Sequence, residues 1–472
     1  MKTWGGRFEA PPDPTAADFG RSIDADLELA LDDLDGSLAH ATALERAGIL
    51  TPDEAETIRE GLAGLRRDLE GGSLEWDPAL EDVHMNVEFA LEARIGLVAR
   101  KVHTGRSRND QVSTDLRLWL RRTIDELDEA ILDLERALVG LARRHEGAVM
   151  PGHTHVQPAQ PVLFAHHLLA YVEMLERDRG RLADARRRAN VSPLGSGAVA
   201  GAGFRLDREA VAADLGFEGV TRNSIDASGD RDFVAETLAA VALAMVHLSR
   251  LAEEVVWWSN PRFGFVRPSD AFSTGSSMLP NKRNPDPAEL VRARAGRVVG
   301  HLAGFLTVLK GLPLAYQRDL QEDKPPLFES CRVLLASLRV LAGLVAGLRV
   351  DEERMRAAAG EGFGTAVCVA DSLVERGVAF RAAHHVVGEL VRRAEANGTS
   401  LGDLPAAEFA AVLAASDDAA AQRLASSEAA IAELHASATV EAALRRPDVV
   451  GGTAPHRVAA ELAAAAERLG LA

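Results

Sequence analysis

The segment DQVSTDLRLWLRRTIDELDEAILDLERALVGLARRHE, residues 110–146, decides the fold of this 472-residue chain. Its apolar residues recur every three or four positions and charged residues fill the positions between them, which is the pattern of an amphipathic α-helix. We expect one helix over the whole segment, about 55 Å long at about 1.5 Å per residue. The acidic residues between Asp125 and Glu135 should form a solvated face. The buried stripe should consist of Val112, Leu116, Trp119, Leu120, Ile124, Leu127, Ile131, Leu134, Leu138 and Leu141.

Four further segments repeat apolar residues at the same spacing. They cover residues 161–189, with Pro161 suited to the first helical turn, and residues 230–259, 286–312 and 326–348. Five long helices in succession must bury their apolar faces against one another, so the sequence predicts an all-α fold built on a long central helix bundle. The second and third helices are apolar around much of their circumference. We therefore expect other copies of the chain to complete the bundle.

Shorter helical segments, punctuated by glycine and proline, lie on both sides of the bundle sequence. A chain of this length corresponds to about three average domains. We expect a smaller helical N-terminal domain over residues 1–105, the central long-helix bundle over residues 106–350 and a smaller helical C-terminal domain over residues 351–472.

The charge balance argues against nucleic acid as a partner. The formal net charge is −17, and no basic block is longer than three arginines. Only five of the 53 basic residues are lysines. High acidity with few lysines is typical of proteins adapted to strong salt, and it is equally typical of a GC-rich genome that favours arginine codons. The sequence leaves both explanations open.

The chain has the features of a cytoplasmic protein. We find no uninterrupted apolar run of the roughly 18 residues that a membrane span needs, and the N-terminal segment MKTWGGRFEAPPDP lacks the apolar stretch of a secretory leader. Cys331 and Cys368 lie far apart and lack CxxC spacing, which argues against a zinc site and against a disulfide framework. We expect a reducing cytosol and no membrane partner.

Polar segments join the long helices, and they lack the apolar periodicity of the helices themselves. HTGRSRNDQ (103–111) precedes the first long helix, MPGHTHVQPAQPV (150–162) follows it, STGSSMLPNKRNPD (273–286) joins the third to the fourth, and YQRDLQEDK (316–324) joins the fourth to the fifth. Two of the five lysines and one of the two tyrosines fall in the last two segments. Loops at the ends of rigid helices usually hold chemistry, so these segments are the candidate site.

Several familiar site classes are absent. GSGAVAGAG (195–203) has the wrong glycine spacing for a dinucleotide-binding turn, and neither a phosphate-binding GxxxxGK[ST] motif nor a GxSxG motif occurs. We expect the glycine-rich segment to be a flexible loop. His153 and His155 lack a third ligand at a supporting spacing, so we expect no metal. The pairs His166-His167 and His384-His385 fall in expected helices, where packing explains them better.

The polar segments together resemble the argininosuccinate lyase family of the fumarase/aspartase superfamily. STGSSMLPNKRNPD is similar to the superfamily's signature loop, and WGGRF (4–8), HTGRSRNDQ, PGHTHVQPAQP, NVSPLGSGAVAG, DRDFVAE and KGLPLAYQRDLQEDK are similar to the argininosuccinate branch. Three departures stand out: His153 replaces the usual tyrosine, Met278-Leu279 inverts the usual order, and Asn281 replaces glutamine. None removes a group to which the family assigns a catalytic role.

The resemblance implies a carbon–nitrogen lyase that needs no cofactor. Its expected reaction is the reversible, non-hydrolytic elimination of argininosuccinate to L-arginine and fumarate, the last step of arginine biosynthesis. Such a reaction requires a base that removes a proton from the carbon next to a carboxylate. It also requires stabilisation of the dianion that forms and protonation of the leaving guanidinium nitrogen.

The resemblance also assigns the catalytic roles. Ser276, the first serine of the GSS motif, corresponds to the base, and Lys282 with backbone N–H groups of the loop is the means to lower its proton affinity. His155 corresponds to the general acid or proton shuttle. Glu289 corresponds to its carboxylate partner, which would orient the imidazole ring.

A larger set matches positions that bind the substrate. Arg108 can pair bidentately with a carboxylate, and Lys282 offers a point charge near the dianion. For Arg231 a structural salt bridge with Asp230 or Asp232 is the alternative. The matched binding positions are Ser22, His84, Ser107, Arg108, Asn109, Thr154, Arg231, Asn284, Tyr316, Gln321 and Lys324.

Other functions stay open at this point. Adenylosuccinate lyase is the rival within the superfamily, although HTGRSRNDQ and WGGRF oppose it, and fumarase and aspartase fit less well. The resemblance also extends to lens crystallins, so a catalytically silent structural protein is the alternative from another class.

The loops lie at opposite ends of long helices. HTGRSRNDQ lies at the start of the first long helix and MPGHTHVQPAQPV at its far end, about 55 Å away. They meet only if antiparallel copies bring opposite ends together. The resemblance implies such a homotetramer, with each active site built from three chains.

Overall fold

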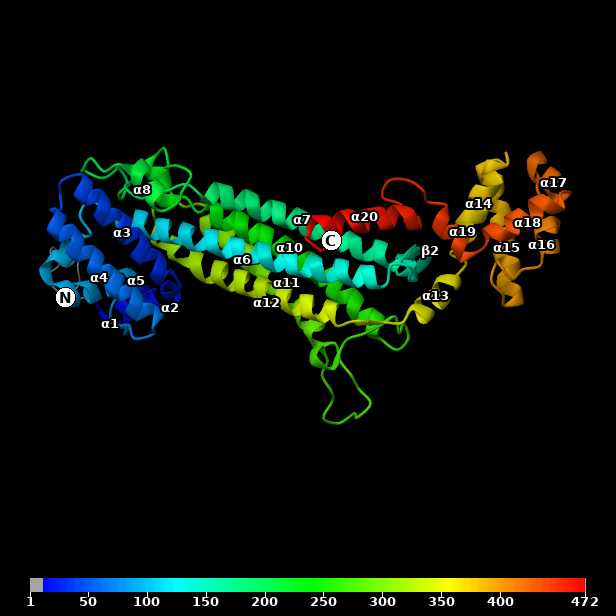
Figure 1. Ribbon diagram of the computed structural model, residues 1–472, viewed down its shortest axis with the longest axis horizontal. Helices are drawn as coiled ribbons and strands as arrows, with labels where there is room; N and C mark the ends of the chain where they lie inside the picture. Colours follow the sequence, from blue (N-terminus) through cyan, green and yellow to red (C-terminus); the bar gives the residue numbers. More distant parts are fainter. Residues whose placement is uncertain (1–11, 472) are drawn as a thin grey trace. The chain divides into compact units, whose positions relative to one another are not determined.

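The computed structural model describes residues 12–471, and it confirms the all-α fold class. The motif WGGRF lies outside the described residues. Within residues 12–471 the strands are short and pair only in twos, β1 with β2 and β3 with β4, so helices form nearly all of the regular structure (Figure 1).

The five long helices are present with nearly the expected bounds. All ten residues of the expected stripe on the first are at most 8% exposed, which confirms the helical period. Most ends differ from the expected positions by two or three residues, as helix ends commonly do. The long helices are α6 (Arg108–Arg144), α7 (Phe164–Ala189), α10 (Asp232–Ser259), α11 (Asp286–Leu309) and α12 (Lys324–Ala346).

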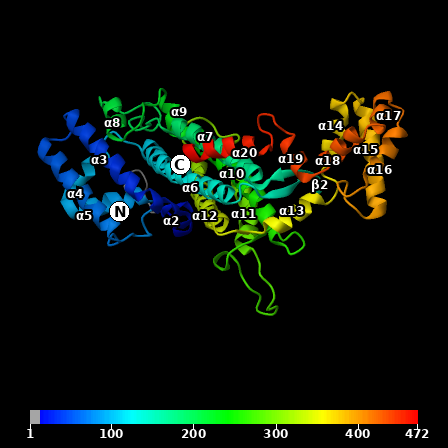
Figure 2. The same cartoon turned by 45° about the vertical axis from the view of Figure 1, so that its right-hand side comes forward.

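The chain divides into two compact units, and the divisions fall inside the long helices. Unit 1 comprises residues 1–129, 178–246 and 294–336, and unit 2 comprises residues 130–177, 247–293 and 337–472. In each unit the segments of the long helices run side by side (Figures 1 and 2). This division groups residues that contact one another in space, whereas the expected domains divide the chain by its order in sequence. The three domains expected from glycine and proline punctuation therefore stay a prediction.

Unit 1 has its own hydrophobic core among the shorter helices. Leu44, Ile58 and Leu91 are buried together there. The α4 helix begins at a capping box, in which the Thr51 hydroxyl accepts from the Glu54 N–H and the Glu54 carboxylate accepts from the Thr51 N–H. The shorter elements of unit 1 are α1 (Pro14–Gly20), α2 (Ile23–Asp26), η1 (Leu27–Leu29), α3 (Ala30–Arg46), α4 (Pro52–Glu70), α5 (Val83–Ile95), η2 (Gly96–Lys101), α8 (Arg208–Asp214), α9 (Ser224–Gly229) and η4 (Arg318–Asp323).

Unit 2 carries a second helical core near the C-terminus. Leu373, Leu390 and Phe409 are buried in it with residues of the neighbouring short helices. The shorter elements of unit 2 are β1 (Val149–Thr154), β2 (Gln157–Leu163), β3 (Val266–Arg267), η3 (Asp270–Phe272), β4 (Arg349–Val350), α13 (Glu352–Gly360), α14 (Ala366–Glu375), α15 (Phe380–Asn397), α16 (Ala406–Ala414), α17 (Ala419–Ala425), α18 (Glu428–Ser437), α19 (Val440–Arg445) and α20 (Pro455–Arg468).

Two local expectations were wrong. The segment 150–162 is a β-hairpin and not a loop, so Pro161 lies in β2 and α7 begins after it. Glu135 is fully buried, although the acidic residues of its segment were expected on a solvated face. Asp125 does follow that expectation, because its side chain is 58% exposed and pairs with Arg186 on α7.

Among the helices of residues 12–471, α10 alone is long and apolar enough to cross a membrane when it is judged by length and composition. More than half of its most apolar window is buried, as expected for a core helix of the bundle. Both halves of α10 also form ion pairs with neighbouring helices, as a packed helix does. Glu236 binds Arg188 of α7, and Glu253 binds Arg292 of α11.

His40 predicts a pH-dependent contribution to stability. It is 1% exposed and its Nε2 is 2.9 Å from the Thr104 carbonyl oxygen. Burial, together with the nearby Arg106 guanidinium, lowers the pKa of His40 from 6.5 to about 3. The unfolded chain therefore binds a proton more readily, and stability falls as the pH drops below 6.5. Relative to His40→Gln, the wild type should lose about 2 kcal/mol between pH 7 and pH 5, measured by chemical denaturation. Equal losses in both proteins would contradict this.

Candidate active site

The start of α6 places three of the predicted binding residues. The Ser107 Oγ accepts from the Asn109 N–H at 3.2 Å, and the buried Asp110 accepts from the Ser107 N–H at 3.0 Å. These side chains cap the helix, so HTGRSRNDQ enters α6 in a fixed conformation. Arg108 and Asn109 then project from its first turn.

A cavity of about 270 Å³ in unit 1 collects most of the predicted binding residues. It is formed by the segment before α2, the start of α5, the first turn of α6 and the segment from Tyr316 into α12. Seven of the eleven predicted binding residues line it: Ser22, His84, Arg108, Asn109, Tyr316, Gln321 and Lys324. Segments about 300 residues apart in sequence, from Ser22 to Lys324, therefore supply one site.

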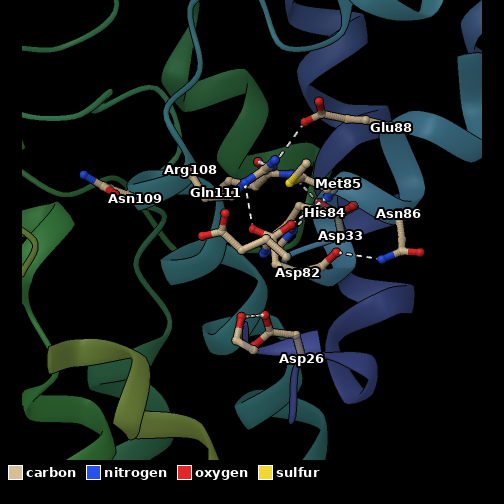
Figure 3. A network of polar contacts seen from close by, with 12 residues as sticks. Asp26, Asp33, Asp82, His84, Met85, Asn86, Glu88, Arg108, Asn109 and Gln111 are labelled. Atoms are coloured by element: carbon tan, nitrogen blue, oxygen red, sulfur yellow. Dashed lines mark hydrogen bonds and ion pairs between the residues drawn. The ribbon is translucent and has the colours of Figure 1, made fainter. Parts of the chain in front are cut away.

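Arg108 is held by carboxylates on one side of this cavity. Its Nε lies 3.2 Å from Asp82 and one terminal nitrogen lies 3.1 Å from Glu88 (Figure 3). The same nitrogen donates to the Gln111 Oε1 at 2.6 Å. Burial disfavours its charge, but Asp82 and Glu88 outweigh this and raise the pKa of Arg108. The guanidinium is therefore charged and held in one orientation.

Lys324 supplies a second cation at the cavity. Its side chain is 4% exposed, and its Nζ lies 3.2 Å from Asp323 and 3.5 Å from Asp26. Burial lowers the pKa of Lys324, but the two carboxylates outweigh burial and raise it. Burial also raises the pKa of Tyr316, so the phenol keeps its proton and can donate to an anion.

Arg231 pairs with Asp323, as Lys324 does, but it does not line the cavity. Its side chain is 0% exposed, and its Nε lies 2.5 Å from an Asp323 oxygen. It also donates to the Asp230 backbone carbonyl. The structure thus supports the alternative of a structural salt bridge, but with Asp323 as the partner in place of the Asp230 or Asp232 side chain. Binding of substrate by Arg231 stays a prediction.

The sequence interpretation missed several residues of the cavity. Asp26 is buried beside Ser22, whose hydroxyl donates to it, and burial raises the pKa of Asp26. The ion pair of Arg318 with Glu81 also lines the cavity. These charged residues lie near polar segments, but charged residues are so common on protein surfaces that the sequence alone gave no reason to select them. The lining residues not predicted are Asp26, Glu81, Asp82, Met85, Val112 and Arg318.

The glycine-rich segment is anchored at its start. The Gly195 and Gly197 N–H groups donate to Asp110 at 3.0 and 2.7 Å, which ties the segment to the first turn of α6. Gly197 has φ +61°, and a Cβ there would lie 3.0 Å from the Gly201 oxygen, so glycine is required. The start of this loop is therefore a fixed support of the site.

His155 lies at the tip of the β1–β2 hairpin in unit 2. The turn has positive φ at both central residues, 54° at His155 and 63° at Val156. Such turns match the twist of paired strands but favour asparagine and glycine. A β-branched residue there is strained, and strain of this kind is concentrated at functional sites. His155 is exposed at this tip, and Thr154 is the last residue of β1.

The signature loop, residues 273–286, is an irregular segment of unit 2. Thr274 and Asn284 form an isolated antiparallel bridge that closes it. The Ser276 Oγ accepts from the Met278 and Leu279 backbone N–H groups at 3.3 and 3.0 Å. Two donors to one hydroxyl oxygen stabilise developing negative charge on it.

The predicted catalytic residues of unit 2 do not form a site within one chain. Lys282, Glu289 and His155 are exposed, and Ser276 is half-buried. Among residues 12–471 we find no hydrogen bond or ion pair that joins any of these four side chains to another. The predicted partnership of His155 with Glu289 is thus not formed in the single chain and stays a prediction.

Comparison with known proteins identifies the family. A family model described as "Lyase" matches residues 6–300, and one described as "Argininosuccinate lyase C-terminal" matches residues 363–440. The chain is 48% identical over 467 residues to an argininosuccinate lyase of Chromobacterium violaceum, covering 99% of both chains. The chain belongs to the argininosuccinate lyase family. It is also 46% identical to an argininosuccinate lyase of Nitrosospira multiformis, covering 99% of this chain and 95% of that one.

Solved structures of related lyases have the same fold. EDDS lyase in complex with formate is 31% identical, with a TM-score of 0.83 over 98% of this chain and 93% of that chain. A class II fumarase from Schistosoma mansoni has a TM-score of 0.72 at 16% identity, which shows the shared fold. The resemblance read from the loops is therefore confirmed at the level of the family.

Proposed function

We propose that this protein cleaves argininosuccinate to L-arginine and fumarate without a cofactor. The observation that carries this proposal is the unit 1 cavity, which gathers seven of the predicted binding residues of an argininosuccinate lyase. The family assignment over 99% of the chain supports the same reaction. The products place the enzyme at the last step of arginine biosynthesis.

The charges of the cavity fit such a substrate. Argininosuccinate carries three carboxylates, an ammonium group and a guanidinium group, so its site needs both signs of charge. Arg108 and Lys324 supply fixed cations for carboxylates. Asp26 and Glu81 supply carboxyl groups for the ammonium and guanidinium groups of the substrate. We propose that the cavity holds the substrate through this pairing and that Thr154 and Asn284 reach it from other copies of the chain.

We propose that Ser276 removes the proton and His155 returns one to the leaving nitrogen. The two N–H groups that donate to the Ser276 oxygen support this role, because they favour the ionised form of the base. The exposed ammonium of Lys282 lies six residues further along the same loop, where it can meet the dianion. Glu289, in the first turn of α11, would orient His155 of another copy.

We infer that the active protein is a homotetramer with shared sites. The α11 helix supports this, because an added Cβ at Gly296, Gly300 or Gly304 would meet nothing within 4 Å. Leu306 and Val299 on the same helix are 49% and 45% exposed. A face of small and apolar residues without a partner in one chain is suited to close helix packing between copies.

A turnover assay tests the proposed function. Purified protein is mixed in turn with argininosuccinate, adenylosuccinate, malate, and fumarate with ammonia, and the absorbance of fumarate is followed. We expect conversion of argininosuccinate alone. Conversion of adenylosuccinate would favour the rival within the superfamily. No turnover of any substrate by folded protein would favour the crystallin-like alternative.

Lys282→Met should lower kcat and substrate affinity together. The change keeps the length of the side chain but removes the charge that we assign to both the substrate carboxylate and the dianion. The loss in kcat/KM should be about 10²-fold or more, as for removal of one group that stabilises transition-state charge. Arg283→Met, next to it in the loop, is the control, because Arg283 pairs with Asp270. An unchanged kcat with only a raised KM would mean that Lys282 merely collects substrate.

We also propose a cytosolic location, supported by two free and buried cysteines, Cys331 and Cys368.

A salt titration separates the two explanations of the acidic composition, adaptation to strong salt and codon bias. If the chain is adapted to salt, its melting temperature should rise steeply from dilute buffer to molar KCl, because screening relieves the repulsion behind the net charge of −17. A flat profile would favour codon bias.

A further inference from the structure

Behind the cavity, unit 1 contains a buried group of three titratable side chains. Asp33 on α3, His84 on α5 and Asp115 on α6 are each at most 1% exposed. One ligand-type atom of each lies within 4.8 Å of those of the other two. Of the three, only His84 lines the cavity. The two aspartates thus belong to no role assigned so far.

Asp33 contacts His84 directly and is linked to Arg108 through Gln111. One of its oxygens lies 3.0 Å from the His84 Nδ1 and also accepts from the Gln111 Nε2 at 2.5 Å (Figure 3). Gln111 in turn accepts from Arg108. Burial opposes ionisation of Asp33, but His84, Arg106 and Gln111 together hold its pKa well below the ordinary value. Asp33 is therefore an ionised anchor.

Asp115 is in the opposite electrostatic state. Its nearest oxygen lies 3.5 Å from the His84 Nδ1, and neither carboxyl oxygen has a hydrogen-bond partner among the described residues. Burial, and then repulsion from Asp33 and Asp32, raise the pKa of Asp115 far above its ordinary value, against the pull of Arg106 and Arg108. Two adjacent buried carboxyl groups cannot both ionise at low cost, so one of them keeps a proton.

We propose that Asp33 is a positioning residue that fixes His84 through Nδ1, and that Asp115 is its proton-bearing neighbour. The Nδ1 of His84 is occupied by Asp33, and its Nε2 makes no hydrogen bond among the described residues. Because Nδ1 is held in this way, the ring has one orientation, in which Nε2 can form a hydrogen bond to a bound substrate. The proton on Asp115 limits the buried negative charge behind an anion site. This proposal rests on the proposed function of the cavity.

The same three residues have the chemistry of metal ligands, but their surroundings favour hydrogen bonding. The Asp33 oxygen that faces His84 already receives two donors, His84 and Gln111. The Arg106 guanidinium acts on both carboxyl groups, so a second cation at the same place would be repelled. Metal content is therefore an outcome of the test and not the proposal.

The experiment measures fumarate affinity for Asp33→Asn, Asp115→Asn and a matched control by calorimetry. We expect Asp33→Asn to weaken binding by about 10- to 100-fold, the usual effect of removing a partner that orients a ligating histidine. The loss of fumarate affinity in Asp115→Asn should be several-fold smaller than in Asp33→Asn, because an amide has the shape and charge of a protonated carboxyl group. Asp35→Asn is the control, since Asp35 lies on the same helix as Asp33 but pairs with Arg66 of α4. It should keep wild-type affinity.

A double-mutant cycle separates positioning from a general structural role. If Asp33 acts through His84, the double variant Asp33→Asn/His84→Asn should bind fumarate no more weakly than His84→Asn alone. Losses that simply multiply would overturn the positioning role. Should Asp33→Asn fail to fold, the smaller Asp33→Ser takes its place in the cycle.

Infrared spectroscopy tests the proton without reference to activity. The wild type at pH 7 should have the carbonyl stretch of a protonated carboxyl group, and Asp115→Asn should lose it. Absence of that band in the wild type, or one bound metal ion per chain that Asp115→Asn removes, would overturn the assignment. Failure of the proposed function is recognised separately, as a folded wild type that has this band but does not turn over argininosuccinate.

Discussion

Replacing Ser276 with alanine is expected to lower kcat by about 10²- to 10⁴-fold while substrate binding stays largely intact. The hydroxyl oxygen of Ser276 receives two backbone N–H groups and lies in the signature loop of unit 2. Most of the groups that we assign to substrate binding line a cavity in unit 1. Removal of the hydroxyl therefore deletes the base without deleting a main carboxylate anchor.

The measurement compares kcat with a directly determined Kd for Ser276→Ala. Ser273→Ala is the matched control, because Ser273 lies in the same loop and its hydroxyl donates to the Ser269 carbonyl. The control should retain most of the wild-type rate. A Ser276→Ala enzyme with a third of the wild-type kcat would remove Ser276 from the role of base.

The long helices could be predicted because their period is a direct consequence of burial. A helix that packs along its whole length must repeat apolar residues every three to four positions, and α6 does so for 37 residues. Leu116, Leu134 and Leu141 are accordingly fully buried. Glu135 breaks the rule, since sequence cannot distinguish a buried carboxylate from a solvated one on the same helix.

The hairpin could not be predicted from the same signals. Its strands contain three prolines and a glycine, which usually end strands, and its turn lacks the expected asparagine or glycine. His155 and Val156 occupy the turn at a cost in backbone strain that local sequence preferences do not anticipate. Tertiary contacts of the hairpin with α13 outweigh local preference there.

The cavity could be predicted only in part, for a related reason. Ser22, Arg108 and Lys324 were selected through resemblance to family motifs, and the fold brings them together. Asp33 and Asp115 were not selected, because an acidic residue within a helix is most simply interpreted as part of its solvated surface. Only the three-dimensional contacts with His84 distinguish them.

The last expected result concerns how complete sites form. The α6 helix has 37 residues, which corresponds to about 55 Å, and it separates the first turn that carries Arg108 from the hairpin that carries His155. A helix of this length cannot bring its two ends to one substrate. Antiparallel copies can bring opposite ends together, so we expect inactive variants to complement each other in mixed tetramers.

The experiment combines His155→Asn with Ser276→Ala. The two inactive proteins are dissociated, mixed in equal amounts and reassembled, and exchange is verified with differently labelled chains. If each site takes His155 and Ser276 from different chains, random assembly leaves both groups intact in about a quarter of the sites. Activity should therefore recover to about a quarter of the wild-type value, and each variant reassembled alone is the control. Verified exchange without recovered activity would mean that one chain supplies both residues, and the shared-site arrangement would then be abandoned.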